Sequence, residues 1–220
     1  MINYLKTSII FTLCCSLPVC ATEFNLGIQL TSTHLDIRDN ANRHVAELSN
    51  DFDISPTISI SSKSYYISNQ HSFGVQFQLD GNLIKVNQQT LHQNNQATNI
   101  DSNIDGYAIY AVPLFFYHFN RNQQEKWQIK MGFGLGLGYL NLSGHYQITH
   151  PIHPEFKETK NIKLSEVGPT FGFYVKVKKG NHAFLLYNFT PYVNDRSYQF
   201  QEYNPVFAYQ YTINLNHLFY

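Results

Sequence analysis

The sequence predicts an all-β fold, an eight-stranded antiparallel up-and-down transmembrane β-barrel. Three observations predict it: apolar residues alternate with polar or small ones, charged residues make up only 14% of the chain, and long polar connections alternate with short ones. An average soluble protein has about 25% charged residues, so a surface built from this chain would be poor in charge. The 15 Lys and Arg residues balance the 15 Asp and Glu residues. The chain therefore lacks the basic excess of a nucleic-acid-binding protein.

Residues 1–21 have the pattern of a cleaved secretory signal. Lys6 precedes a short apolar run, and Val19-Cys20-Ala21 has the compact residues that precede a cleavage site. The run is shorter than the ~20 residues that a membrane-spanning helix needs. Lipidation of Cys20 is the alternative, and Val19 disfavours it because a small residue normally precedes a lipidated cysteine. All three cysteines lie at 14, 15 and 20, so residues 22–220, expected to form a single β-barrel domain, have no disulfide and no cysteine metal site.

Residues 127–139 show the clearest strand pattern. All seven odd positions, from Trp127 to Tyr139, are apolar, and the even positions hold Gln128, Lys130 and four glycines. A period of two places these two sets on opposite faces of a β-strand. Similar alternation, or an apolar run of strand length, predicts eight strands at 23–35, 53–67, 72–84, 106–118, 127–142, 164–178, 182–192 and 206–219.

The connections between the predicted strands are of two kinds. Short connections lie at 68–71, 119–126 and 179–181. Long polar connections lie at 36–52, 85–105, 143–163 and 193–205. Long loops on one side and short turns on the other are typical of an outer-membrane barrel, and an even strand number places both chain ends on the short-turn side, facing the periplasm.

The two faces of the strands are expected to meet different solvents. Large apolar side chains should face lipid, as listed here: Phe133, Leu135, Leu137, Phe171, Phe173, Val175 and Ile213. The charged residues with the opposite parity should face the lumen: Glu23, Lys63, Asp80, Lys130, Lys176 and Lys178. A soluble barrel of the lipocalin type is the alternative. Its outer face would be dense in Lys and Glu, whereas the polar face here is mostly Gly, Ser, Thr, Gln and Asn.

The lumen of an eight-stranded barrel is just wide enough for side chains, so an open aqueous channel is not expected. Unpaired buried charges are costly, so Glu23 is expected to pair with Lys63, and Asp80 to reach Lys130. The lysines at 176 and 178 are expected to stay hydrated at the periplasmic mouth.

The four glycines of strand 127–142 leave a groove on the inner wall. We expect bulky inward side chains of neighbouring strands to fill it, namely Tyr110, Phe116 and Tyr174. The alternative is that these glycines serve only to ease the curvature of the strand.

Two segments resemble a known family. The run from Tyr107 to Tyr117, followed after a polar turn by the alternating segment from Gly132 to Tyr139, is similar to the small eight-stranded outer-membrane β-barrel proteins, the OmpA-like or "porin family" group of Gram-negative bacteria. The resemblance implies an outer-membrane location, contact with outer-membrane lipids and with the barrel-assembly machinery, and no cofactor. One departure is at the end of the chain. Phe219 has the lipid-facing parity of the family's terminal aromatic residue, and Tyr220 follows it.

Candidate catalytic residues lie in the third long connection. Some small barrels modify lipid A or phospholipids with a Ser, a His and a carboxylate near the membrane rim, and Ser143, His145, Glu155 and Glu158 provide these types. No local motif of such an enzyme surrounds them, and we predict no catalytic site.

A histidine metal site in the same connection is also disfavoured. The candidate ligands are His145, His150 and His153. His150 and His153 have chelating spacing, but the prolines at 151 and 154 extend the backbone and spread the two imidazoles apart, so we predict no metal site.

The sequence predicts a structural or surface-recognition (adhesin-like) role, with a host or matrix ligand bound by the long extracellular loops. A narrow passive porin for small solutes is one alternative, and a lipid A or phospholipid-modifying barrel enzyme is another.

Overall fold

The computed structural model describes residues 21–38, 44–67, 72–86, 89–93, 96–121, 126–149, 157–191, 193–194, 198–201 and 206–214. The expected signal sequence lies outside these residues except for Ala21, with which the first strand begins. Phe219 and Tyr220 also lie outside them. No helix in this part of the chain is long and apolar enough to cross a membrane.

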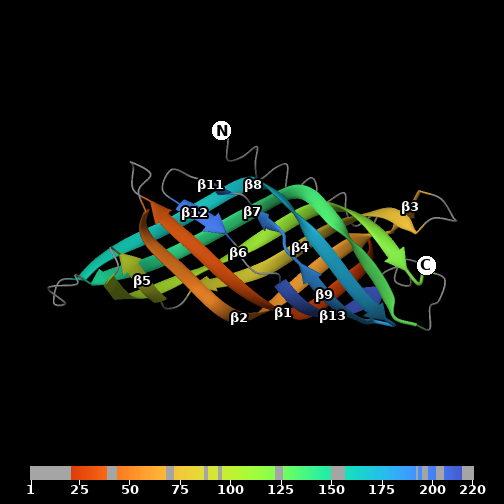
Figure 1. The fold of residues 1–220 in the computed structure, drawn as a ribbon, viewed down its shortest axis with the longest axis horizontal. Coiled ribbons are helices and arrows are strands. Elements are labelled where there is room, and N and C mark those ends of the chain that lie inside the picture. Colours follow the sequence, from red (N-terminus) through yellow and green to blue (C-terminus); the bar gives the residue numbers. More distant parts are fainter. Residues whose placement is uncertain are drawn as a thin grey trace.

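Eight antiparallel strands form a closed ring, which confirms the predicted barrel (Figure 1). They are β1 (Ala21–Arg38), β2 (His44–Ser62), β4 (Phe73–Val86), β6 (Gln96–Phe119), β7 (Gln128–Thr149), β8 (Lys157–Lys179), β9 (His182–Tyr187) and β13 (Val206–Asn214). Each strand pairs with the next along the chain, and β1 closes the ring by pairing with both β2 and β13. Closure pairs every ring strand on both sides along part of its length.

Five short strands attach to the ring. They are β3 (Tyr65–Tyr66), β5 (Gln89–Gln93), β10 (Thr190–Pro191), β11 (Val193–Asn194) and β12 (Tyr198–Gln201). β3 pairs with β4, β5 with β6, and β10 with β8, while β12 pairs with both β1 and β11.

Three strands are much longer than predicted. β6, β7 and β8 have 24, 22 and 23 residues, about twice what a tilted strand needs to cross a membrane. We call residues 96–106, 141–149 and 157–166 of these strands the extension, and the opposite end of the barrel, where β1 and β7 begin, the base. Figure 1 shows the extension projecting from the rest of the barrel.

The extension corrects the prediction of long loops at 85–105 and 143–163. Residues from both segments pair strand to strand, for example Ser102 with Tyr146 and Ser143 with Lys163. The predicted loop 36–52 is likewise occupied by the ends of β1 and β2, which pair as far as Arg38 and His44. The outward residues of the extension are polar and hide the strand pattern in the sequence, although inward residues such as Ile104, Leu142 and Ile162 are apolar and buried.

Two predicted strands are interrupted. The predicted strand 53–67 breaks after β2, because Ser61 and Ser62 are both buried and the alternation then changes parity. The Ser62 hydroxyl accepts a hydrogen bond from the backbone N–H of Phe77 at 2.9 Å, which holds the irregularity in place. The predicted strand 182–192 breaks at Asn188 and Phe189, between β9 and β10.

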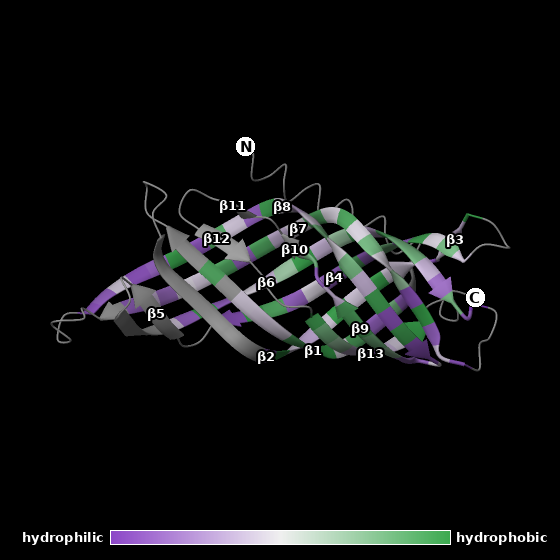
Figure 2. Cartoon of the chain, viewed as in Figure 1, coloured by the Kyte–Doolittle hydropathy of each residue, from purple (hydrophilic) through white to green (hydrophobic). Residues whose placement is uncertain are grey.

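Burial alternates along the strands, and hydropathy follows it (Figure 2). Along β4, for example, Gln76, Gln78, Asp80 and Asn82 are all buried, while Phe73 and Leu83 are 55% and 48% exposed. Polar side chains therefore face the inside of the barrel and large apolar side chains the outside, the reverse of a soluble barrel.

Candidate functional site

The outer wall of the barrel is a continuous apolar surface. Every one of the eight ring strands contributes at least one large hydrophobic side chain that is exposed, from Ile28 on β1 to Phe207 on β13. Of the residues predicted to face lipid, six are exposed and Val175 is half-buried on the same face, as listed here: Phe133, Leu135, Leu137, Phe171, Phe173 and Ile213. We call this surface the apolar band.

The height of the apolar band can be estimated along β7. Ile129 and Tyr139 are its first and last outward apolar residues, and ten residue steps separate them. At about 3.3 Å per residue and a tilt of about 40°, they span about 25 Å, the height of the apolar band of an outer-membrane barrel. Beyond Tyr139 the outward residues of β7 are Asn141, Ser143 and His145, so the polar extension begins where the band ends.

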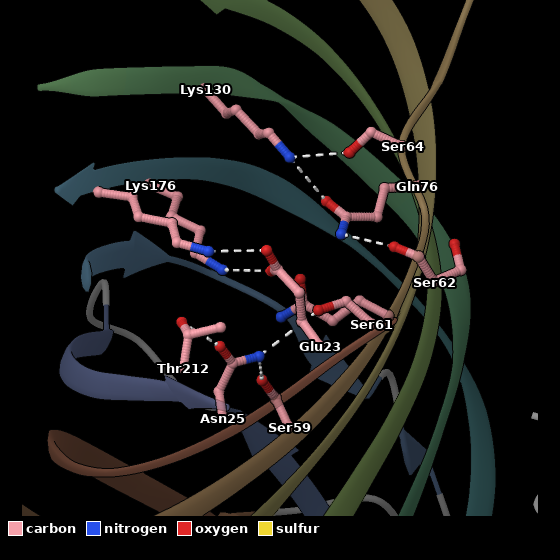
Figure 3. Close-up of polar contacts among 12 residues, drawn as sticks. Glu23, Asn25, Ser59, Ser61, Ser62, Ser64, Gln76, Lys130, Lys176 and Thr212 are labelled. Atoms are coloured by element: carbon pink, nitrogen blue, oxygen red, sulfur yellow. Dashed lines mark hydrogen bonds and ion pairs between the residues drawn. The ribbon is translucent and has the colours of Figure 1, made fainter. Parts of the chain in front are cut away.

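Charged side chains meet inside the base. Lys178 Nζ donates to Glu23 Oε1 at 2.7 Å, and Lys176 Nζ lies 3.5 Å from Glu23 Oε2 (Figure 3). The side chains of Lys178, Lys176 and Glu23 are 23%, 5% and 24% exposed, respectively. The expectation that the two lysines stay hydrated at the periplasmic mouth is therefore wrong for Lys176, which is buried against Glu23, whereas Lys178 remains partly exposed.

Lys63 does not belong to this cluster. It is exposed, and it follows the parity change at Ser61 and Ser62. The prediction that Lys63 faces the lumen and pairs with Glu23 is therefore wrong. The alternation of inward and outward residues shifts by one position at an irregularity that adds one residue to the strand.

Lys130 and Asp80 both face inward but do not pair with each other. Lys130 Nζ donates to Ser64 Oγ at 2.8 Å and to Gln76 Oε1 at 3.2 Å, as Figure 3 shows. Asp80 is 2% exposed, and both of its carboxylate oxygens accept from Gln78 Nε2, at 2.9 and 2.7 Å. The predicted ion pair is wrong because amide and hydroxyl groups satisfy each charge instead: Gln78 of the same strand for Asp80, and Ser64 and Gln76 for Lys130.

Neutral polar side chains cross-link the middle of the lumen. Asn25 Nδ2 donates to Ser59 Oγ at 3.0 Å, and Asn25 Oδ1 accepts from Thr212 Oγ1 at 2.7 Å, which joins β1 to β2 and β13. Farther along, Tyr187 OH donates to Gln29 Oε1 at 2.9 Å and accepts from Asn82 Nδ2 at 3.4 Å. These bonds tie strands on different sides of the lumen together and rigidify the barrel.

The inner wall of β7 carries bulky neighbours, as predicted. Gly132 lies directly between Phe116 on β6 and Tyr174 on β8, and Gly138 lies beside Tyr110. These three aromatic side chains are at most 3% exposed. A Cβ atom at Gly134 would lie 2.3 Å from Val112 Cγ1 and 2.9 Å from Phe189 Cε1, so the groove is fully occupied.

An apolar cluster fills the inside of the extension and the adjoining part of the barrel. Its members come from five ring strands and are each at most 3% exposed: Leu35, Ile84, Ile104, Leu140, Leu142, Tyr146, Ile162 and Leu164. The interior behind β7 and inside the extension is therefore filled by side chains. This packing disfavours the narrow porin alternative.

The candidate catalytic residues are not brought together. Ser143 and His145 are exposed on the outer face of the extension. Glu158 lies four residues before the buried Ile162 on the same strand, so it belongs to the opposite face. Its carboxylate forms a 3.4 Å ion pair with Lys160. Glu155, like His150 and His153, lies outside the described residues. Within the described part of the chain, no group of three or more His, Cys, Asp or Glu side chains could hold a metal ion.

Three buried residues of the interior were missed in the sequence. Phe189 and Tyr187, at 1% and 2% exposure, lie in a segment that is apolar on both faces, so periodicity could not orient them. His118 is 5% exposed, and its Nδ1 lies 2.5 Å from Tyr66 OH. Its even position, continuing the inward parity of Phe116, was the signal that could have identified it.

Among known proteins, the chain is similar to solved structures only in its fold. No family model and no curated protein sequence matches the chain. Among solved structures, the chain is similar to the crystal structure of Ail, the attachment invasion locus protein of Yersinia pestis, in complex with the heparin analogue sucrose octasulfate. The TM-score is 0.38 and the identity 10%, over 86% of this chain and 99% of that chain. The fold assignment rests on the strand pairing described above.

Proposed function

We propose that this chain is an outer-membrane β-barrel protein of a Gram-negative bacterium with a structural or surface-recognition role. In this proposal residues 1–21 are a secretory signal, the apolar band contacts outer-membrane lipids, and the barrel-assembly machinery inserts the chain. The protein needs no cofactor and performs no catalysis.

One observation carries the proposal, namely the inverted distribution of polar and apolar side chains. Phe133, Leu135 and Phe171 are 62%, 60% and 76% exposed, while Gln78, Asp80 and Lys176 are at most 5% exposed. A soluble monomer rarely exposes a contiguous apolar patch of more than a few hundred Å², and here the patch encircles the barrel. A lipid bilayer stabilises such a surface. It also requires backbone groups to be paired within the protein, and the closed ring gives each strand a neighbour on both sides along part of its length.

The extension is the part of the molecule suited to recognition. Its outward face is polar and exposed in three adjacent strands, with Asp105, Ser143 and Lys163 side by side, and Asn103, His145 and Asn161 in the next row. A paired sheet holds these side chains in fixed positions, so it presents a rigid surface beyond the membrane. Rigid presentation lowers the entropic cost of binding a ligand.

Cell fractionation tests the membrane location. The protein should be recovered in the outer-membrane fraction and should migrate on gels at a different apparent mass when unheated than when boiled, because a closed barrel resists detergent. Recovery in the soluble periplasmic fraction would contradict the proposal.

Shortening of the extension tests the recognition role. Replacing residues 143–163 by Asn-Gly, which closes a two-residue hairpin between Leu142 and Leu164, removes the β7 and β8 parts of this polar face. It should leave the heat-modifiable barrel intact and abolish adhesion of expressing cells to host cells or matrix proteins. Unchanged adhesion with a folded, shortened barrel would contradict a recognition role for the extension.

A further inference from the structure

Basic side chains lie in one row on the inner wall at the base. His118 on β6, Lys130 on β7 and Lys176 on β8 are successive cross-strand neighbours, and all three have the inward parity. Directly opposed residues of paired strands have Cβ atoms about 5 Å apart, so their polar ends can reach a common group.

The carboxylates inside the base do not balance these cations. Glu23 is bound by Lys176 and Lys178 together, so one negative charge serves two lysines. Lys130 Nζ has only neutral acceptors, Ser64 Oγ and Gln76 Oε1, and it lies 4.8 Å from the centre of the Phe116 ring. Within the described residues no ion pair joins Lys130 to a carboxylate. A cation in such surroundings is stabilised strongly by an anion.

The buried imidazole of His118, beside Lys130, also favours an anion at this place. His118 Nε2 is buried and has no hydrogen-bond partner among the described residues, while Nδ1 is engaged by Tyr66 OH. We assign Tyr66 OH as the donor to Nδ1, an assignment that places the ring hydrogen on Nε2. A buried N–H without an acceptor costs about 1–3 kcal/mol. An oxygen atom placed between His118 and Lys130 would satisfy both groups.

We propose that the inner wall at the base binds an oxyanion of the phosphate class, with His118 Nε2 and Lys130 Nζ donating to its oxygens and Lys176 contributing positive charge. A tetrahedral oxyanion suits the site because it offers several acceptor oxygens to donors from different strands. Two sources share this chemistry, namely free inorganic phosphate and the phosphate group of a phospholipid at the membrane surface. The site is separate from the polar face of the extension and does not depend on its ligand.

Titration of the refolded barrel with inorganic phosphate tests the site. In a neutral, phosphate-free detergent at constant ionic strength, calorimetry should show saturable binding at one site per chain. Lys130→Met should weaken this binding at least tenfold, whereas Lys130→Arg should keep it within about threefold, since the charge and donors remain. Lys163→Met is the matched control, because Lys163 is exposed on the outer face of the extension, and it should bind as the unchanged chain does.

Folding must be checked first for each variant by heat-modifiable migration. If Lys130→Met does not fold, His118→Phe provides the second test, because it keeps an aromatic ring and removes the Nε2 donor. It should also weaken phosphate binding at least tenfold. Absence of saturable binding by the unchanged folded chain, or equal affinity in the folded Lys130 or His118 variant, overturns the proposal.

A competition experiment with a phospholipid identifies the source of the phosphate group. Short-chain phosphatidylglycerol added below its micelle concentration should displace inorganic phosphate in a Lys130-dependent manner if a lipid headgroup is the ligand. Phosphate binding that depends on Lys130 and resists this lipid assigns the site to the free anion. Both results support the proposed site.

Discussion

Glu23 is the carboxylate that contacts two lysines inside the base, and its neutralisation should destabilise the barrel. Glu23→Gln leaves Lys176, which is 5% exposed, and Lys178 without an anionic partner. Removing one partner from a buried ion pair costs up to about 3–5 kcal/mol, and because Glu23 is itself a quarter exposed we expect about 2–3 kcal/mol. The free energy of unfolding in urea, measured in lipid vesicles, checks this value.

Lys63→Gln is the matched control for Glu23→Gln. It also changes one charge near the base, but Lys63 is exposed and lies outside the cluster. Its unfolding free energy should stay within about 0.5 kcal/mol of the unchanged chain. A loss in the Lys63 variant as large as that in the Glu23 variant would contradict the pairing described here.

Parity alone placed five of the six predicted lumenal charges on the inner side, and it failed at Lys63. The failure has a local cause, because the irregularity at Ser61 and Ser62 is held by a hydrogen bond from the backbone of another strand. The partners of the charges were also wrong in the prediction. Parity gives the face of a residue, whereas the tilt and stagger of the strands decide which residues meet across the lumen.

Among the elements, β7 depends on its glycines. A Cβ atom at Gly132 would lie 1.9 Å from the backbone oxygen of Phe115, and a backbone atom cannot move aside without breaking the ladder between β6 and β7. Gly132→Ala should therefore lower the free energy of unfolding by about 3 kcal/mol or prevent folding. Urea unfolding in vesicles, or the fraction of heat-modifiable barrel, measures the effect.

Gly81→Ala is the control for the glycine prediction. Gly81 is also a strand glycine, but the nearest atom to an added Cβ is Ile58 O at 3.9 Å, an ordinary contact. The alanine variant should fold and unfold as the unchanged chain does, within about 1 kcal/mol. Equal tolerance of alanine at both positions would show that close packing of β6 against β7 is not required.

At the level of elements, the sequence predicted the parts of the strands that carry the apolar band better than their ends. Each of the eight ring strands covers or overlaps its predicted range. The extension was missed because its outward residues, such as Asn103 and Asn161, resemble loop composition, while its inward residues, such as Ile104 and Ile162, alternate too sparsely to stand out. A strand that faces water on one side and a narrow apolar interior on the other has no strong hydropathy signal.

For the whole molecule, a charge on the apolar band should block insertion. Phe133→Arg or Leu135→Lys places a cation near the middle of the band, where it costs about 2–4 kcal/mol in lipid. We expect a severalfold lower yield of outer-membrane, heat-modifiable barrel. Ser143→Arg, on the same face of β7 but beyond the band, should assemble normally. Equal yields from the three variants would refute the assignment of the band.

The apolar cluster predicts that the lumen does not conduct ions. Because side chains such as Leu142 and Ile104 fill the interior next to the extension, the barrel should show no discrete conductance in planar bilayers. Stable single-channel steps from the purified protein would contradict the filled interior.

The most direct test of the central claim is a measurement of which solvent the outer wall of the barrel meets. Residues 21–220 contain no cysteine, so single cysteines can be spin-labelled without interference. In vesicles, a label at Leu135→Cys should collide with lipid-soluble oxygen and be shielded from a water-soluble nickel chelate. Labels at Phe171→Cys and Ile213→Cys should behave in the same way, whereas one at Ser143→Cys should favour the nickel chelate. Preference of the labels at 135, 171 and 213 for the water-soluble reagent would contradict the account of a barrel whose apolar outer wall lies in lipid.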